Sequence, residues 1–294
     1  MSQETPFFSI IIPTYKRPAQ LASCLEAVAR LDYPPERFEV VIVDDGSHAP
    51  PEKLVASFRP RLDIRLLTQR HAGPAAARNY GAARARGDFL AFTDDDCMPD
   101  GDWLRALGAR FRLAPERLIG GRSLNALAHN IYSAASQSII DVVYEHFNEK
   151  GDALFFASNN FAVPARGFHA IGGFDEKFIT SEDRDLCDRW LHHGYKMEYA
   201  PEALIYHAHA LTLDALWRQH FGYGRGAFRF HSARRRRGAE RFKPDRGFYL
   251  KLLRRPFSTE NGSRAFALTS LILWTQLASA AGFAYEMIRR REMF

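Results

Sequence analysis

Three consecutive carboxylates, Asp94, Asp95 and Asp96, follow a short apolar run at residues 89–92. The run is too short for a helix and predicts a buried parallel strand that ends on the three acids. In open α/β sheets, ligands bind at the carboxyl edge of the strands. Because adjacent carboxylates repel one another, we expect them to hold a divalent cation there, Mg²⁺ or Mn²⁺. The alternative is a solvated acidic turn.

Two further acidic pairs stand where chemistry is possible. Asp44 and Asp45 follow a β-branched run at residues 38–43, which predicts a second strand with acids at its carboxyl end. Glu182 and Asp183 fall in the first turn of a predicted helix, whose N-terminal dipole should keep Asp183 ionised. The structural alternatives are an ordinary strand end for the first pair and a helix N-cap for the second.

The elements that must position these acids alternate along the chain. Apolar runs predict strands at four places, and helical spacing or a Pro start predicts the segments between them: 8–12, 38–43, 64–67 and 89–92 for the strands, with helices from Pro18, around 54–58, at 74–86 and at 103–111. This alternation is typical of βαβ units and predicts an α/β fold with a mostly parallel sheet flanked by helices.

The second half of the chain is less regular. We predict helices at 128–147, 181–193 and 211–237, the last made flexible or kinked by Gly222, Gly224 and Gly226. We also predict a strand at 155–163 and two short strands, of which the second ends at 205–209. Three cysteines without metal-type spacing predict neither a disulfide framework nor a cysteine-based metal site.

Charge divides the chain unevenly. Residues 218–294 hold 17 Lys and Arg against 5 Asp and Glu, whereas residues 1–217 hold 23 against 29. We therefore predict an acidic domain at 1–210 and a basic, helical region at 211–294 that meets phosphates, either lipid headgroups or nucleic acid. A solvated charge run is the alternative.

Residues 265–285 carry no charge and precede three arginines, 289–291. The stretch is long enough to span a bilayer, but its Ser, Thr and Gln residues are equally consistent with a helix that lies in the membrane plane or packs on a partner. The first residues lack the pattern of a signal peptide. The expected location is the cytoplasm, at the cytoplasmic face of the membrane.

Five motifs occur together in a characteristic order: 9–15 (SIIIPTY), 41–47 (VIVDDGS), 77–81 (ARNYG), 92–96 (FTDDD) and 181–186 (SEDRDL). The ordered set resembles family 2 glycosyltransferases, over roughly residues 7–230. The resemblance implies a GT-A fold, a nucleotide-sugar donor (most often a UDP-sugar), a divalent cation and inversion at the anomeric carbon. It leaves the acceptor open: a glycan, a lipid-linked saccharide or a small molecule.

The resemblance also implies roles for individual residues. It assigns donor binding to Pro13, Thr14, Tyr15, Asp44, Asp45, Arg78, Asp94 and Asp95. Among these, Asp95 points away from its neighbours in an extended chain and is expected to be mainly structural.

The resemblance implies that other residues bind the metal and carry out catalysis. It assigns the metal to Asp96 and His207, with His209 as the alternative histidine. It makes Asp183 the base that deprotonates the acceptor hydroxyl, with Glu182 beside it.

Two other functions compete with this interpretation. A sugar-nucleotide nucleotidyltransferase also uses an α/β sheet and paired carboxylates, but it would normally show a Gly-rich phosphate loop after the first strand, and residues 12–17 contain no Gly. A nucleic-acid-binding protein would use the basic tail, yet the acidic sheet edge would repel phosphates. We therefore predict that nucleic acid is not a partner.

Overall fold

The computed structural model describes residues 5–148, 152–239 and 243–291. The chain forms two compact units, residues 1–124 with 151–208 and residues 125–150 with 209–294. The second unit thus takes an internal segment in addition to the C-terminal region beyond the predicted boundary at residue 210. The physical reason is that helix α5 (Ile131–Phe147) packs against the C-terminal helices α9 (Arg246–Thr259) and α10 (Gly262–Arg291).

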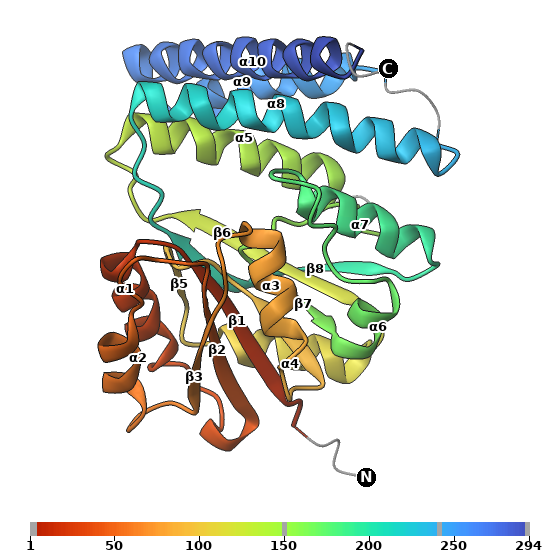
Figure 1. Ribbon diagram of the computed structural model, residues 1–294. Helices are drawn as coiled ribbons and strands as arrows, with labels where there is room; N and C mark the ends of the chain where they lie inside the picture. The colour runs from red at the N-terminus through yellow and green to blue at the C-terminus, as the bar shows by residue number, and fades with distance from the viewer. Residues whose placement is uncertain (1–4, 149–151, 240–242, 292–294) are drawn as a thin grey trace. The chain divides into compact units, whose positions relative to one another are not determined.

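The first half of the sheet in the first unit is parallel (Figure 1). Its strands lie in the order β3-β2-β1-β4, with the bounds β1 Phe8–Thr14, β2 Phe38–Asp44, β3 Ile64–Thr68 and β4 Phe89–Phe92. Every residue of β1 and β2 is buried, as expected for strands covered on both faces. The four predicted strands and their parallel arrangement are confirmed.

Alternate residues of β1 face different helices. Ile10 and Ile12 join the core formed with α1 (Pro18–Val28), α2 (Glu52–Phe58) and α4 (Trp103–Leu113). On the other face, α3 (Pro74–Ala82) packs so closely that a Cβ on Gly81 would lie 2.8 Å from the side chain of Ile11. This close packing holds α3, which carries Arg78 in its second turn, against the sheet.

The rest of the sheet runs β7-β6-β8-β5, with antiparallel pairs at β4–β7, β6–β7 and β5–β8. The bounds are β5 Cys97–Pro99, β6 Leu118–Asn125, β7 Phe161–Pro164 and β8 Met197–His207. Three shorter elements, η1 (Pro35–Arg37), α6 (Ala165–Ala170) and α7 (Glu182–His192), complete this unit. The sheet is therefore mixed, with parallel pairs among β3, β2, β1 and β4 and antiparallel pairs beyond them.

Two strand predictions in this region are wrong. The predicted strand at 155–163 is a strand only from Phe161. Just before it, the side chain of the buried Asn160 accepts a hydrogen bond from the Trp103 indole and donates to the carbonyls of Arg122 and Ala203, which holds the chain in an irregular conformation. The two short strands expected before residue 209 are one strand, β8, which continues through Pro201. The strands β5 and β6 were not predicted.

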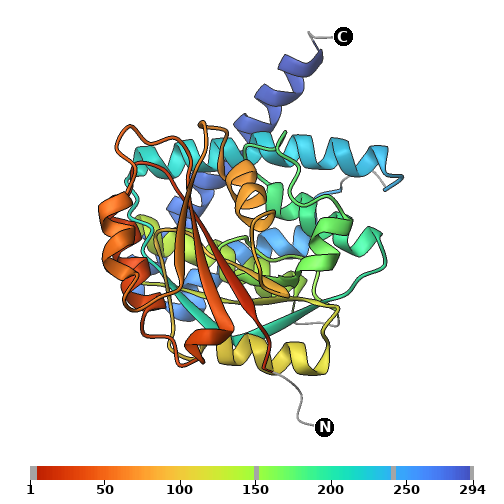
Figure 2. The same ribbon diagram turned by 60° about the horizontal axis from the view of Figure 1, so that its bottom comes forward.

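The second unit consists of the helices α5, α8 (Leu213–Arg236), α9 and α10 in its described residues. They lie alongside one another in Figure 1, and the turned view of Figure 2 shows α10 crossing α8 at an angle. The helix predicted at 211–237 is α8, which is continuous over 24 residues. Gly224 instead lets the helices approach, because a Cβ there would lie 1.9 Å from the Ser279 carbonyl oxygen of α10. On α10, Gly282 meets the Phe221 carbonyl in the same way.

Candidate active site

The side chains of the three adjacent aspartates contact three different partners. Asp94 accepts a hydrogen bond from Arg78, Asp95 accepts one from the Thr14 hydroxyl at 2.7 Å, and Asp96 lies beside His207. A backbone bond from the Cys97 amide to the Asp94 carbonyl closes the turn that separates them. Each carboxylate thus has its own partner, which offsets the mutual repulsion of the three charges.

Asp95 is the most structural of the three, as its position in the chain predicts. The residue is buried, and burial raises the pKa of its carboxyl to about 6, against the hydrogen bond from Thr14 and the charge of Arg17. Arg17 spans the cluster, with Nη1 at 3.3 Å from Asp95 Oδ1 and 3.2 Å from Asp96 Oδ2. Half of the Arg17 side chain is exposed, so it is able to move when another cation binds.

Arg78 joins the acidic cluster to the start of α7. Its Nη2 donates to Asp94 Oδ1 at 2.6 Å and its Nη1 donates to Glu182 Oε1 at 3.0 Å. The residue is 3% exposed, and its charged partners raise the pKa of the guanidinium in spite of burial. Its predicted contact with the nucleotide stays a prediction, because in the structure its two terminal nitrogens bind these carboxylates.

The acids after β2 shape a loop. The Asp45 carboxylate accepts hydrogen bonds from the Gln69 side chain at 2.7 Å and from the backbone amides of Ala72 and Gly73 at 2.9 and 2.8 Å. The carboxylate therefore holds the turn that begins α3.

Asp44 and Tyr15 lie beside this turn. Asp44 Oδ2 accepts from the Ser47 amide, whereas its buried Oδ1 has no hydrogen-bond partner in the described part of the chain. The Tyr15 ring stacks on His71, with centroids 4.2 Å apart. A flat aromatic surface thus lies beside a buried acceptor oxygen.

Glu182 and Asp183 occupy the first turn of α7, which begins after Ser181 in the left-handed conformation, with φ of 68°. A non-Gly residue in that conformation is strained, and such strain gathers at functional sites. Asp183 accepts a hydrogen bond from the Arg184 amide at 2.7 Å. Asp183 is therefore not the N-cap residue, which is Ser181, but its carboxylate does accept a hydrogen bond from the backbone of its own helix.

The environment of this acidic pair differs from our expectation in one respect. We expected the helix dipole to keep Asp183 ionised, but burial raises its pKa. Burial, together with the charge of Asp183, also raises the pKa of Glu182 to about 7, while Arg78 opposes that shift. A carboxylate with a raised pKa is a stronger base, so the observed direction suits proton abstraction near neutral pH.

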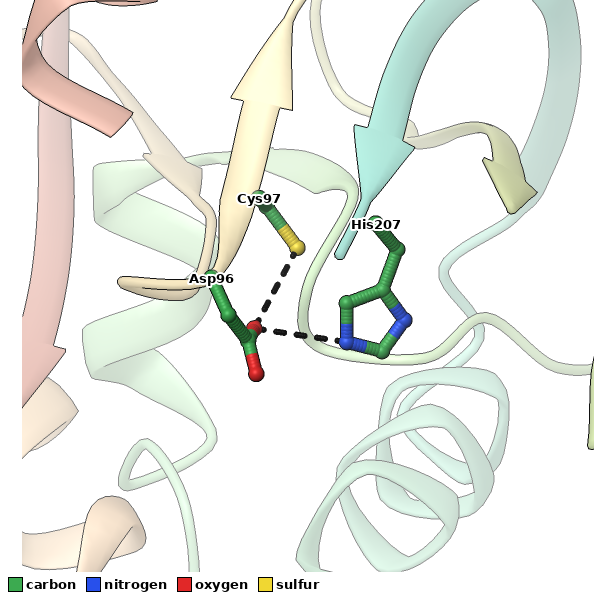
Figure 3. A group of neighbouring side chains, drawn as sticks. All are labelled: Asp96, Cys97 and His207. Atoms are coloured by element: carbon green, nitrogen blue, oxygen red, sulfur yellow. Dashed lines mark hydrogen bonds and ion pairs between the residues drawn. The ribbon is translucent and has the colours of Figure 1, made fainter. Parts of the chain in front are cut away.

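His207 ends β8 and faces Asp96. Its Nε2 lies 3.3 Å from Asp96 Oδ1, and the hydrogen bond with Asp96 raises the pKa of His207 against its burial (Figure 3). The Ala208 amide donates to the Asp96 carbonyl at 2.8 Å, which fixes the two segments together. His209, the alternative ligand, belongs to the second unit, where its carbonyl accepts from Ser133. A carboxylate and an imidazole at this separation suit a divalent cation.

Sequence reasoning missed Arg17, His71 and Cys97. A signal for Arg17 existed, because β1 and β4 are parallel neighbours and the residues after both strands must meet at one edge. Cys97 follows the aspartates directly, yet its place beside His207 depends on β5, which was not predicted. Nothing in the sequence marked His71 as the partner of Tyr15.

The fold and the acidic edge define a class. A mannosyltransferase, PcManGT from Pyrobaculum calidifontis in complex with GDP-Man and Mn²⁺, has a similar structure, with a TM-score of 0.68 and 20% identity over 97% of this chain and 88% of that one. S. aureus TarS 1-349 in complex with UDP-GlcNAc is also similar, with a TM-score of 0.55, 16% identity and coverage of 97% and 92%. The fold is GT-A-like, with a mostly parallel sheet flanked by helices.

The family follows from the sequence comparisons. The family model described as glycosyl transferase family 2 matches residues 9–163, and that of glycosyl transferase family group 2 matches residues 90–288. The chain belongs to glycosyl transferase family 2 and is a glycosyltransferase, as the resemblance predicted.

Two curated relatives illustrate the distance within the family. Glycosyltransferase AglE of Haloferax volcanii is 27% identical over 234 residues, which cover 77% of this chain and 74% of the relative. Validoxylamine A glucosyltransferase of Streptomyces hygroscopicus subsp. limoneus is 30% identical over 233 residues, but the match covers 69% of this chain and about half, 51%, of that longer protein.

Proposed function

We propose that the protein transfers a sugar from a nucleoside diphosphate sugar to a hydroxyl acceptor, with inversion and with the help of a divalent cation. One observation carries this proposal most directly. Arg78 binds Asp94 and Glu182 at the same time, so the acids suited to the donor and the acids suited to the acceptor lie at the two ends of one guanidinium. Inverting displacement needs a base on the side opposite the leaving group, and this arrangement supplies two distinct acidic sites.

The donor's base is proposed to lie in the loop between β1 and α3. The Tyr15–His71 stack offers a flat surface, and the buried Asp44 Oδ1 offers an acceptor for a base N–H. An unpaired buried acceptor is costly, so a ligand that donates to it gains affinity. Similar structures were solved with a GDP-sugar and with a UDP-sugar, and we propose a UDP-sugar for this chain.

The cation is proposed to be held by Asp96 and His207. The fit is supported by the donor set itself, a carboxylate oxygen and an imidazole nitrogen 3.3 Å apart at a sheet edge. When bound, Mn²⁺ or Mg²⁺ neutralises charge on the departing diphosphate. Arg17 bridges Asp95 and Asp96 in the structure and is placed to exchange its contact with Asp96 for one to a phosphate.

Asp183 is proposed to take the proton from the acceptor hydroxyl. Its bond to the Arg184 amide holds one carboxylate oxygen in place, and the raised pKa makes the carboxylate a competent base. Glu182, held by Arg78, orients the turn from which Asp183 projects. The acceptor is a glycan end, a lipid-linked saccharide or a small molecule.

Asp96→Ala is expected to abolish the Mn²⁺-dependent part of UDP binding, because it removes the carboxylate that we place on the cation. The Asp96 side chain is 10% exposed at a sheet edge, and the variant should remain folded. Calorimetric titration of UDP into both proteins, in Mn²⁺ and in EDTA, measures the effect. Asp102→Ala, which removes an exposed acid at the start of α4, is the control. Equal UDP affinity of the wild type in Mn²⁺ and in EDTA would remove the metal from the proposal.

We further propose that the second unit binds the cytoplasmic face of a membrane. The helix Gly262–Arg290 is long and apolar enough to cross a membrane by length and composition, a test that the core helix of a soluble protein also passes. Large apolar side chains on it are exposed, namely Phe266, Leu273, Trp274, Leu277, Tyr285 and Ile288. The basic residues of this unit would add about 1 kcal/mol each near an anionic surface.

The full-length protein is expected to co-sediment with vesicles that contain anionic lipid, and less with neutral vesicles. Leu277→Asn should weaken this binding, since Leu277 is 60% exposed on α10. Leu113→Asn is the matched control, because Leu113 is 84% exposed but ends α4 in the first unit. If the protein stays in the supernatant at low salt, the apolar face of α10 serves another contact.

A further inference from the structure

Cys97 lies beside the two residues that we propose as metal ligands. Its Sγ is 3.8 Å from Asp96 Oδ1, which in turn is 3.3 Å from His207 Nε2. One possible ligand atom from each residue lies within 4.8 Å of the others. Figure 3 shows the thiol and the imidazole on the same side, both directed toward the carboxylate. The family resemblance gave this cysteine no role.

The sheet fixes this arrangement. Cys97 and His207 are directly opposite partners in the antiparallel pair β5–β8, so their side chains leave the sheet on one face. The Cys97 amide bonds the Asp94 carbonyl at 3.1 Å, and the Ala208 amide bonds the Asp96 carbonyl at 2.8 Å. The three ligand atoms are therefore positioned by backbone pairing rather than by flexible side chains alone.

The separations are compatible with one cation bound by all three residues. Metal–ligand distances of about 2.0–2.1 Å for nitrogen or oxygen and about 2.3 Å for sulfur, at tetrahedral angles, place neighbouring ligand atoms roughly 3.3–3.6 Å apart. The oxygen–nitrogen distance of 3.3 Å and the oxygen–sulfur distance of 3.8 Å are close to these values. A small side-chain rotation would bring the sulfur and the nitrogen together around one ion.

We infer that Cys97 is a third protein ligand and that it makes this site selective for thiophilic cations, Zn²⁺ and Co²⁺, over Mg²⁺. The inference rests on the proposed metal site. On binding, the thiol proton passes to solvent and the sulfur bonds the metal, with no change of oxidation state. Soft sulfur ligands favour Zn²⁺ and Co²⁺, whereas Mg²⁺ prefers oxygen ligands in octahedral geometry.

A consequence for the enzyme follows from coordination number. Zn²⁺ with three protein ligands in a tetrahedral site keeps one open position. Six-coordinate Mg²⁺ or Mn²⁺ on Asp96 and His207 keeps more positions for the diphosphate. Zn²⁺ is therefore expected to inhibit the Mn²⁺-supported reaction by competing for the same site.

Co²⁺ absorption tests the inference without relying on activity. Metal-free protein titrated with Co²⁺ should develop the near-ultraviolet sulfur-to-cobalt charge-transfer band, which requires a cysteine ligand. The band should persist in Cys24→Ala, which removes another buried cysteine of the same unit, and vanish in Cys97→Ser. Zn²⁺ affinity should fall at least about tenfold in Cys97→Ser, because even changes around the ligands commonly cost that much. Mg²⁺ affinity should not change.

The outcomes separate this inference from the proposed function. Co²⁺ binding to the wild type without the charge-transfer band would overturn the thiolate ligand, whether or not Cys97→Ser folds. Equal Zn²⁺ affinity in the wild type and Cys97→Ser would do the same. If Asp96→Ala still abolishes Mn²⁺-dependent UDP binding, the proposed function stands in either case. If no cation binds the wild type, both fail.

Discussion

Asp183→Asn is expected to lower turnover at least about a hundredfold while leaving donor affinity nearly unchanged. The amide keeps the shape of the side chain and can still accept the hydrogen bond from the Arg184 backbone, but it cannot accept the proton of the acceptor hydroxyl. A loss confined to kcat is the signature of a group used only in the transition state. Steady-state rates and UDP titrations on both proteins measure the two effects.

Asp175→Asn is the matched control, because Asp175 also accepts a backbone hydrogen bond, from Lys177, but lies outside the proposed base position. The pH dependence adds a second check. Only the ionised base is active, so wild-type kcat should fall as the pH drops below the apparent pKa of the Glu182–Asp183 pair, in which the pKa of Glu182 is about 7. The residual rate of Asp183→Asn should lack that fall. A near-wild-type rate, or a product that retains the anomeric configuration, would argue against Asp183 as the base.

Arg78→Met is expected to destabilise the fold by about 3–5 kcal/mol at pH 8, the usual result of leaving a buried charge without its partner. The substitution removes the guanidinium between Asp94 and Glu182, whose side chains are 29% and 11% exposed. At pH 5 the loss should be smaller, because burial raises the pKa of Glu182 to about 7 and its carboxyl can then take up a proton in the folded state. Urea unfolding at the two pH values measures the free energy of unfolding directly.

Arg17→Met provides the comparison for that experiment. Arg17 also bridges two aspartates, but its side chain is half exposed, so its removal should cost no more than about 1 kcal/mol. If Arg78→Met loses no more stability than Arg17→Met at pH 8, the Asp94–Arg78–Glu182 link does not hold the two parts of the site together. That result would leave the metal and donor assignments unchanged, but it would remove the proposed coupling between Asp94 and Glu182 at the start of α7.

The elements with strong local signals were predictable. The strands that lead to Asp44 and Asp94 are apolar runs buried on both faces, and α3 starts at a Gly-Pro pair, so their types follow from local sequence. Arg78 was singled out by its motif, but not its pairing. That pairing joins residues 104 positions apart, and no local pattern encodes such a distance.

The antiparallel half of the sheet was less accessible. β5 has three residues, too few to show an alternation of apolar and polar side chains in the sequence. It is a strand because it pairs with β8. Asn160 sits in an apolar run that suggests a strand, and only the tertiary contacts with Trp103 and two carbonyls explain why its backbone turns. In α8, three glycines suggested flexibility or a kink, whereas Gly224 lets the α10 backbone approach closely.

The strand order also constrains the loop that carries the three aspartates. β4 and β5 are separated by four steps across the sheet, roughly 19 Å if it were flat. The chain from Phe92 to Cys97 could reach at most about 17 Å fully extended, and its turn at Asp94 shortens that reach. The sheet must therefore be twisted and curved enough to bring β5, its edge strand, within reach of β4. The loop of the three aspartates spans that distance. Adding or deleting one residue in this loop would both displace the acids and change how tightly the sheet closes.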